Sequence, residues 1–221
     1  MIVDISAAIL LVGAGPVDHS ILSDASTVTH AVVAADGGAN TVLQAGLTPA
    51  AILGDGDSLS ESSRNVTDPS ILHIIDEQDT TDLEKSLARL RAPLIIGLGF
   101  LGGRFDHSLA AMNALVQYRN RAVLLIGAED ACFHIPHDLE VNLSKGTRFS
   151  IFPMAPARAR STGLEWPLDP HHFDPIGRIG TSNQVTGPVR VSTDDPGLIG
   201  IIPRSDWRVA AAALWPAFPG E

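Results

Sequence analysis

Six short aliphatic runs recur along the first 130 residues of the chain. Each is almost free of polar positions and is flanked by Gly or Asp, which is typical of strands buried on both faces of a sheet. The runs are Ala7–Val12, Ala31–Ala35, Ala50–Leu53, Leu72–Ile75, Leu94–Leu98 and Ala122–Ile126.

Segments with helical spacing lie between these runs. The clearest are Asp82–Leu90 and Ser108–Tyr118, and in the second of these Leu109, Met112, Leu115 and Val116 are predicted to share one face. Alternating strands and helices predict an α/β domain with a mostly parallel sheet. Because ligands of such sheets bind outside the carboxyl ends of the strands, polar residues that follow the aliphatic runs are candidates for a functional site.

The pattern changes after about residue 135. The apolar runs become shorter and are separated by Gly, Pro and Asp turns, which predicts a smaller, mostly antiparallel β domain. We therefore expect an α/β domain over residues 1–135 and a β domain over residues 136–221. The predicted strands are Leu139–Val141, Thr147–Phe152, Val189–Val191 and Leu198–Ile202. The alanine-rich stretch Val209–Leu214 fits either a short helix or a frayed end.

Composition narrows the class of protein. Hydrophobic residues make up 45% of the 221 residues and the formal net charge is −10, which predicts a soluble globular protein and disfavours nucleic acid and anionic membranes as partners. The apolar N-terminal segment contains Asp4 and is too short to span a membrane. Cys132 is the only cysteine, so the expected location is the reducing cytoplasm.

Two acidic residues follow the third aliphatic run. Asp55 and Asp57 are two positions apart, and their side chains point to the same side if the strand continues through Gly54. Two carboxylates on one side repel unless a cation lies between them. Mg²⁺ is the expected ion, because it takes oxygen ligands from one or two carboxylates, waters and phosphates. A solvated acidic turn is the alternative interpretation.

The second acidic cluster lies at the start of the first predicted helix. Thr81 and Glu84 have the spacing of a capping box, which places Asp82 in the first turn with Lys85 on the same side. A helix N-terminus favours anions, so Lys85 is a candidate phosphate contact and Asp79 or Asp82 a candidate metal ligand. Plain helix capping with an Asp82–Lys85 ion pair is the alternative.

Two glycine-containing turns are candidates for binding a polyphosphate. In Gly102-Gly103-Arg104-Phe105-Asp106 the glycines let backbone N–H groups approach a ligand, and Arg104 can bind phosphate through two hydrogen bonds. A structural turn with an Arg–Asp pair is the alternative here. Asp36-Gly37-Gly38 also follows an aliphatic run and opens a helix, although this sequence is common in ordinary turns.

Two other motifs receive no role. Gly13-Ala14-Gly15 resembles the start of a dinucleotide fingerprint, but Asp18 stands at the position of the third glycine, so NAD binding is not expected. His171 and His172 lie in a loop rich in Pro and Asp, where solvent exposure is the simpler interpretation.

The ordered set of motifs resembles the thiamine pyrophosphokinase family over residues of about 30 to 202. The resemblance rests on Ala35-Asp36-Gly37-Gly38-Ala39-Asn40, Gly54-Asp55-x-Asp57-Ser58, Thr81-Asp82-x-x-Lys85, Gly99-x-x-Gly102-Gly103-Arg104-Phe105-Asp106, Gly163-Leu164-Glu165-Trp166 and Gly180-Thr181-Ser182-Asn183. It implies an N-terminal α/β domain followed by a C-terminal β-sandwich, and a homodimer with active sites at the subunit interface. It also implies transfer of pyrophosphate from ATP to the hydroxyl of thiamine with Mg²⁺ as the metal.

The resemblance also implies roles for single residues. Asp55, Asp57 and Asp82 resemble the metal-binding and catalytic acids, supported by Asp36 and Asp79. Lys85, Arg104 and Asp106 resemble groups that bind ATP, together with Gly37, Gly38, Gly102 and Gly103. Trp166 resembles an aromatic residue that stacks on thiamine, and Ser182 and Asn183 resemble a polar pair that contacts the ligand.

Three positions differ from the family pattern or fall where that pattern varies. Gly56 replaces a bulky residue between the two acids, Glu165 replaces a common Lys, and His107 stands where Gln or His occurs. Two rival functions stay open: a pyrophosphokinase acting on a hydroxymethyl pterin, and a catalytically silent sensor of thiamine or nucleotide. The number of acids directed to a metal disfavours the sensor.

Overall fold

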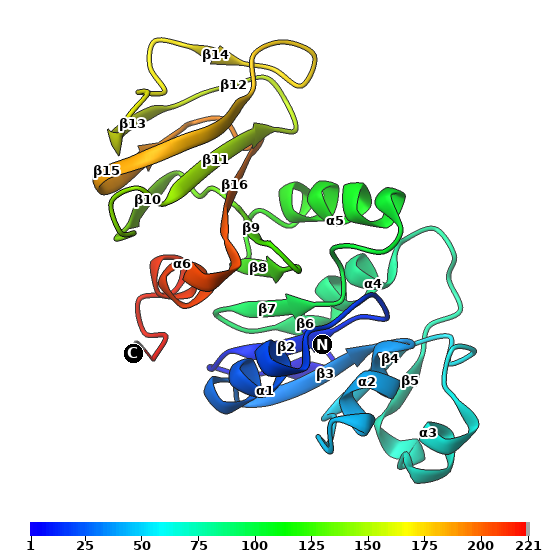
Figure 1. Ribbon diagram of the computed structural model, residues 1–221. Coiled ribbons are helices and arrows are strands. Elements are labelled where there is room, and N and C mark those ends of the chain that lie inside the picture. Colours follow the sequence, from blue (N-terminus) through cyan, green and yellow to red (C-terminus); the bar gives the residue numbers. More distant parts are fainter. Residues whose placement is uncertain (220–221) are drawn as a thin grey trace. The chain divides into compact units, whose positions relative to one another are not determined.

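The computed structural model describes residues 1–219, which form two compact units (Figure 1). The first unit comprises residues 1–111 and 125–128, and the second comprises residues 112–124 and 129–219 of the described chain. Residues 220 and 221, the end of the predicted β domain, lie outside the described residues. Among residues 1–219, no helix has both the length and the apolar character needed to cross a membrane.

The first unit is built on a parallel sheet in the order β7-β2-β3-β4-β5. Its strands are β2 (Ile9–Val12), β3 (Ala31–Ala35), β4 (Ala51–Gly54), β5 (Leu72–Ile74) and β7 (Ile95–Leu98). All four residues of β2 are fully buried, and the strand lies inside the sheet with β3 on one side and β7 on the other. The predicted mostly parallel sheet is therefore confirmed.

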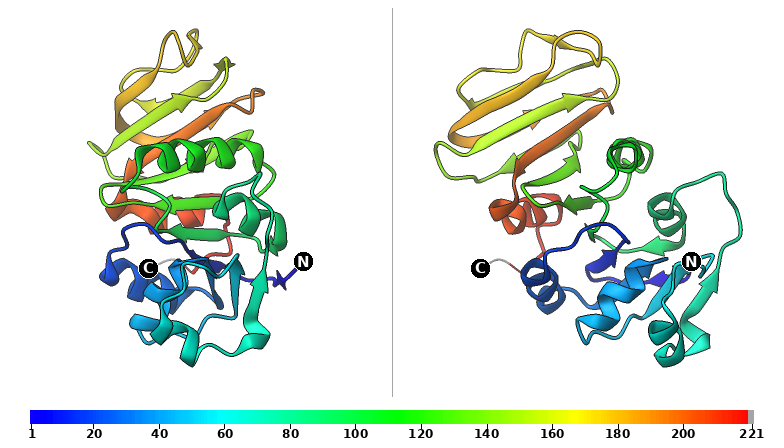
Figure 2. Two further views of the ribbon diagram at one scale, coloured as in Figure 1. Left: turned by 90° about the vertical axis from the view of Figure 1, so that its right-hand side faces the viewer. Right: turned by 45° about the vertical axis from the view of Figure 1, so that its right-hand side comes forward.

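Helices connect the parallel strands, as the alternation in the sequence predicted (Figure 2). They are α1 (His19–Val28), α2 (Gly38–Gln44), α3 (Glu61–Val66), the 3₁₀ turn η1 (Pro69–Ile71) and α4 (Asp82–Arg89). A short parallel pair, β1 (Val3–Asp4) with β6 (Leu90–Arg91), accompanies the main sheet. The helix α5 (Phe105–Gln117) follows β7, and β8 (Val123–Ile126) follows α5.

The glycines of Gly13-Ala14-Gly15 have a structural explanation. The loops after β2 and β7 are joined by hydrogen bonds from Gly13 N to Leu98 O at 2.8 Å and from Gly15 N to Gly99 O at 2.9 Å. A Cβ atom on Gly15 would lie 2.6 Å from Gly99 O, so the two backbones approach too closely for a side chain. Close backbone packing, rather than a dinucleotide, accounts for this motif.

The second unit is an antiparallel β structure. Its strands are β9 (Asp130–His134), β10 (Asp138–Val141), β11 (Arg148–Pro153), β12 (Ala157–Arg158), β13 (Arg160–Leu164), β14 (His172–Phe173), β15 (Gly180–Ser192) and β16 (Leu198–Pro203). β16 pairs with β9 and β11, while β12 pairs with β14. β15 pairs with β11 near its start and with β13 and β10 further along, so this one strand takes part in three ladders (Figure 1).

The C-terminal stretch is helical. α6 (Trp207–Leu214) follows the 3₁₀ turn η2 (Arg204–Asp206), and Trp207 is buried with its ring edge-on to Phe218 at a centroid distance of 6.1 Å. Of the two interpretations of Val209–Leu214, the helix is correct. Cys132 on β9 is a buried thiol, and burial raises its pKa to about 12.

Candidate active site

Four loops that carry the predicted polar residues leave the sheet at the same edge. Because β3, β4, β5 and β7 are parallel, their carboxyl ends meet there, and each loop starts directly after its strand. Asp36 follows β3, Asp55 follows β4, and the segment 76–82 follows β5. The run from Gly99 to Asp106 follows β7 and leads into α5. The sequence-based placement of these clusters is correct.

Three carboxylates meet at this edge. Asp36, Asp55 and Asp57 each offer one oxygen, and these oxygens all lie within 4.8 Å of one another. Asp36 is buried, with 8% of its surface exposed, and its Oδ1 has no hydrogen-bond partner. A buried carboxylate oxygen without a partner is costly unless a cation compensates it. The donor set, all carboxylate oxygen, suits a hard divalent cation.

The backbone around Asp36 is specialised for this arrangement. Asp36 has a φ of 44°, in the left-handed region that Asp tolerates better than most residues. The neighbouring strand β4 ends in Gly54, and a Cβ there would lie 3.0 Å from Asp36 Oδ1. The absence of a side chain at Gly54 therefore leaves the space that the carboxylate of Asp36 occupies.

Asp55 and Asp57 come together through a turn. β4 ends at Gly54, so strand alternation is not what brings the two carboxylates together, contrary to the geometry expected from the sequence. Asp57 N donates to Asp55 Oδ1 at 3.1 Å, with Gly56 at a φ of 76° between them. The hydrogen bond from the Asp57 backbone lowers the pKa of Asp55, and smaller contributions come from the Gln78 side chain and the Lys85 charge.

The capping box predicted at the start of α4 is present. Thr81 Oγ1 accepts from Glu84 N at 3.3 Å, and Glu84 Oε2 accepts from Thr81 N at 2.9 Å. These bonds fix the first turn of the helix, where Asp82 and Lys85 lie on one side and form an ion pair at 3.8 Å. Lys85 is nevertheless buried, with only 5% of its side chain exposed.

Asp82 shares the electrostatic field of the acidic group. Burial raises the pKa of Asp82, and the carboxylates of Asp36 and Asp55 raise it further. The interactions with Lys85 and His107 oppose this shift. Asp82 therefore lies near the three-carboxylate group without belonging to it, as far as residues 1–219 show. Asp79 lies in the same loop with an exposed side chain, and its backbone N donates to Glu77 Oε2 at 3.0 Å.

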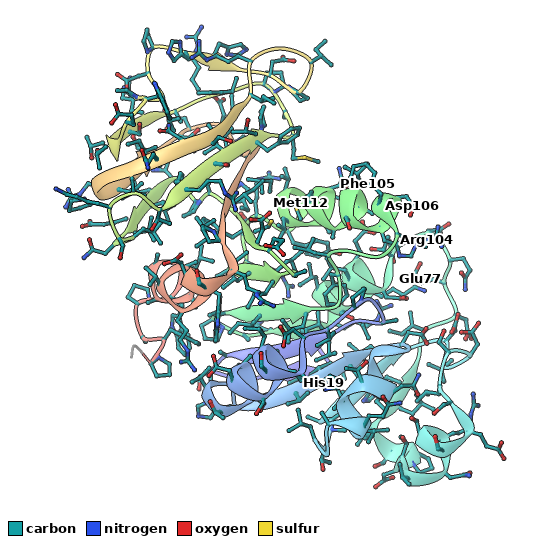
Figure 3. The ribbon with its side chains drawn as sticks, in the orientation of Figure 1. His19, Glu77, Arg104, Phe105, Asp106 and Met112 are labelled. Carbon is teal, nitrogen blue, oxygen red and sulfur yellow. The ribbon has the colours of Figure 1, made fainter. Side chains whose placement is uncertain are left out.

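Arg104 and Asp106 form an exposed pair at the start of α5, where Figure 3 labels both residues. Arg104 Nε donates to Asp106 Oδ1 at 3.1 Å and Nη2 donates to Oδ2 at 2.6 Å. The Arg104 guanidinium lowers the pKa of Asp106. Gly102 and Gly103 have φ values of 83° and 66°, which favour glycine. Because a guanidinium has five N–H donors, the pair with Asp106 leaves donors for a phosphate.

Three further residues of this edge received no binding role from the sequence. Gln78 bonds to Asp55, and His107 is close enough to Asp82 to oppose the rise in its pKa. Asn40 donates from Nδ2 to Ser58 O at 2.9 Å and accepts from Ser60 N at 3.0 Å, which holds the loop after Asp57. Asn40 was already part of the motif quoted for the family. For Gln78 and His107 the sequence offers one indication only, which is that each is a polar residue next to a candidate acid.

The second unit carries the remaining three candidates. Trp166, two residues after β13, is 59% exposed. Ser182 on β15 is exposed and has a φ of 63°, and its backbone N donates to the buried Ser150 Oγ at 2.9 Å. Asn183 is buried, with 6% of its surface exposed, and its amide bonds to the backbone of Trp166. Of these three candidates, Trp166 and Ser182 therefore have exposed side chains and Asn183 does not.

Comparison with known proteins decides the family. A family model described as the catalytic domain of thiamin pyrophosphokinase matches residues 23–126, and one described as its vitamin B1 binding domain matches residues 133–198. Thiamine pyrophosphokinase 1 of Oryza sativa subsp. japonica is 32% identical over 204 residues, which cover 77% of each chain. The chain belongs to the thiamine pyrophosphokinase family. This result confirms the family and the enzyme class predicted from the sequence, and it does not favour the pterin enzyme or the silent sensor.

Solved structures of thiamine pyrophosphokinases agree with the assignment. The crystal structure from Geobacillus thermodenitrificans matches with a TM-score of 0.73 at 26% identity and covers 89% of this chain and 96% of that chain. The enzyme from Candida albicans matches with a TM-score of 0.75 at 18% identity, which is a likeness of fold, and covers 89% and 90% of the two chains. The two family matches leave residues 127–132 between them, and the boundary at residues 135 and 136 stays our proposal.

Proposed function

We propose that this chain transfers the pyrophosphoryl group of ATP to the hydroxyl of thiamine, giving thiamine diphosphate and AMP. The observation that carries the proposal is the group of Asp36, Asp55 and Asp57, with an unpartnered buried oxygen, at the carboxyl edge of a parallel sheet. Such a group is suited to a metal-bound polyphosphate, and family membership supplies the reaction.

A divalent metal is required by kinases of this family, and we propose Mg²⁺ as the ion. Asp36, Asp55 and Asp57 would hold it. When bound, it would neutralise charge on the phosphate oxygens. The hydrogen bond from the Asp57 backbone lowers the pKa of Asp55, which favours the ionised form that a metal ligand needs. The metal role predicted for Asp82 from the sequence stays untested.

The cationic side chains have distinct proposed tasks. Lys85 is buried beside Asp82, so its charge acts at close range on phosphate oxygens bound at the N-terminus of α4. Arg104 is exposed and paired with Asp106, so we propose that it binds ATP with the donors that Asp106 does not use. Gly37, Gly38, Gly102, Gly103 and Asp79 complete the proposed ATP site.

We propose that Asp82 is the base that accepts the proton of the thiamine hydroxyl. Its pKa is raised by burial and by neighbouring carboxylates, which makes it a stronger base than Asp55, whose pKa is lowered. The hydroxyl oxygen forms a bond to the β-phosphorus, the bond from that phosphorus to the α-phosphate oxygen breaks, and AMP leaves with that oxygen. Asp82 takes the proton released from the hydroxyl. Positioning and charge would account for most of the rate.

The thiamine site and the assembly are also proposals. Trp166 offers an exposed aromatic face, which attracts a cationic ring, and Ser182 offers a hydroxyl. We propose that these residues bind thiamine in a homodimer whose active sites lie at the subunit interface. We further propose a cytoplasmic location, which the single buried Cys132 supports.

The test is AMP release by the purified protein from ATP and Mg²⁺, with thiamine or a hydroxymethyl pterin offered in parallel. AMP that depends on thiamine would support the proposal, while AMP that depends on the pterin would replace the substrate. Asp57→Asn is the matched control, because it keeps the size of the side chain and removes its charge. Absence of AMP from the unaltered protein with either alcohol would contradict the proposed function.

A further inference from the structure

The side-chain amide of Asn183 forms its hydrogen bonds with backbone groups, mainly those of Trp166. Trp166 N donates to Asn183 Oδ1 at 3.1 Å, and Asn183 Nδ2 donates to Trp166 O at 2.7 Å. Asn183 Oδ1 also accepts from the backbone N of its neighbour Gln184 at 2.9 Å. The side chain is buried, with 6% of its surface exposed, so water does not replace these bonds. Both ends of the amide thus bind Trp166.

This pair of bonds extends a β ladder beyond its last strand residue. β13 ends at Leu164, which pairs with Val185 of β15, and Glu165 N still donates to Gln184 O at 2.9 Å. At Trp166 the next partner on β15 is a side chain, since the Asn183 amide offers one donor and one acceptor as a peptide group does. The Trp166 backbone therefore forms both hydrogen bonds that a paired strand residue would form, although it lies outside the strand.

The indole of Trp166 extends from this fixed backbone to the surface. It is 59% exposed and borders a pocket of about 140 Å³ whose lining includes Arg178 and Thr181. An aromatic side chain with a fixed backbone loses little conformational entropy when a ligand stacks on it. Exposure of such a large aromatic surface costs stability unless a ligand or partner covers it.

We propose that Asn183 is a positioning residue. It acts on bound thiamine, a heteroaromatic cation, only by holding Trp166 in place. This inference rests on the proposed function, and it separates Asn183 from Ser182, whose exposed side chain is the one that faces solvent. It replaces the direct ligand contact that the family resemblance implied for Asn183, because Oδ1 accepts two backbone hydrogen bonds and Nδ2 donates one to Trp166 O. Asn183 also lines the pocket beside Trp166, but only 6% of its surface is exposed.

The test is a double-mutant cycle between Asn183 and Trp166. Asn183→Leu keeps the volume and removes both bonds to Trp166 together with the bond from Gln184 N. We expect the KM for thiamine to rise about tenfold, the equivalent of about 1.4 kcal/mol, with the KM for ATP unchanged. In the Trp166→Ala background the same change should have no further effect on the KM for thiamine. Thr186→Ala, at an exposed position of the same strand, is the control variant and should match the unaltered protein.

A second readout does not depend on turnover. In a chain with Trp207 and Trp215 replaced by Phe, the fluorescence anisotropy of Trp166 reports its local mobility. We expect Asn183→Leu to increase that mobility while the far-ultraviolet circular dichroism stays unchanged. The inference is overturned if the losses from Asn183→Leu and Trp166→Ala add in the cycle, or if the mobility of Trp166 does not change. If the unaltered protein releases no AMP with thiamine, the proposed function fails instead, and the anisotropy result still decides whether Asn183 holds Trp166.

Discussion

At the carboxyl edge of the sheet, Asp36 occupies the space that a side chain at position 54 would need, and that position is Gly54. A Cβ atom on Gly54 would lie 2.8 Å from the Cβ of Asp36 and 3.0 Å from its Oδ1. Real side chains do not tolerate such distances, so a larger residue at position 54 must displace Asp36. The geometry of the three-carboxylate group therefore depends on a residue that has no functional group.

Gly54→Ala should reduce activity much more than stability. The added methyl group moves Asp36 away from Asp55 and Asp57, and a displacement of about 1 Å costs about a hundredfold in kcat. The measurement is the steady-state rate of AMP release together with thermal unfolding. Gly187→Ala is the control, because a Cβ at Gly187 meets nothing within 4 Å. A Gly54→Ala protein with unaltered kcat would show that the position of Asp36 is irrelevant.

Asp36→Asn should change the response to metal. Asn tolerates the left-handed backbone at this position and removes one charge from a group of three carboxylates. Without metal we expect the variant to be more stable by about 1 kcal/mol, a rise of about 2 to 4 °C in Tm. Addition of Mg²⁺ should stabilise the unaltered protein and have little effect on the variant. Equal stabilisation of both proteins by Mg²⁺ would exclude Asp36 as a ligand.

Thr81→Ala should weaken the start of α4. The change removes the hydroxyl that accepts from Glu84 N, at a cost of about 1 kcal/mol. Because this turn holds Asp82 and Lys85, the KM for ATP should also rise. Thermal unfolding and ATP kinetics check both effects. Glu84→Gln should preserve most of the stability, since Gln also completes a capping box, whereas a loss equal to that of Glu84→Ala would contradict this explanation.

His137 should make stability depend on pH. Its Nδ1 lies 2.7 Å from Asp138 Oδ2 and its Nε2 lies 2.9 Å from Asp194 Oδ1. Hydrogen bonds to Asp138 and then to Asp194 raise the pKa of His137 above its ordinary value of 6.5. A raised pKa means that the folded state favours the protonated ring, so the stabilisation is complete below that ordinary value and is lost as pH rises through the raised one.

The corresponding measurement is denaturant unfolding of the unaltered protein and His137→Gln. The free energy of unfolding should differ most at about pH 5.5 and least at about pH 8.5. Asp194→Asn tests the cause, because it removes one of the two carboxylates that face the ring. A difference between His137→Gln and the unaltered protein that does not vary with pH would rule out protonation of His137 as its source.

The parallel sheet was predictable because its strands are unbroken apolar runs. Strands with one exposed face were harder to find: β13 reads Arg-Ser-Thr-Gly-Leu, and most of the polar residues of β15 point outward, so only Val189–Val191 was predicted from its 13 residues. α5 begins at Phe105 rather than at the predicted Ser108. Gly102 and Gly103, which precede it, have positive φ values and so lie outside the helix. Of the residues predicted to share one face of this helix, Leu115 is buried and Leu109 is 51% exposed. The other buried positions of the helix are Ala111 and Ala114.

The sequence allowed us to name candidate residues for the site, but it did not allow us to predict how their side chains are arranged. The motifs identified Asp55, Asp57 and Lys85, but sequence alone does not show that Asp36 has a buried, unpartnered oxygen. That feature arises where Asp36, Gly54 and the turn after β4 meet, and it depends on strand register and backbone angles. The commitment of the Asn183 amide to Trp166 likewise depends on where β13 ends against β15.

The length of β15 limits which insertions and deletions this chain tolerates. Its buried positions alternate with exposed ones from Asn183 through Val185 and Val189 to Val191, while the same strand carries Ser182 at its start. Removal of one residue between Asn183 and Val191 would turn every later side chain to the opposite face. Natural relatives should therefore vary in residue type at the exposed positions of this strand but keep its spacing, and changes in length should occur in the loops on either side.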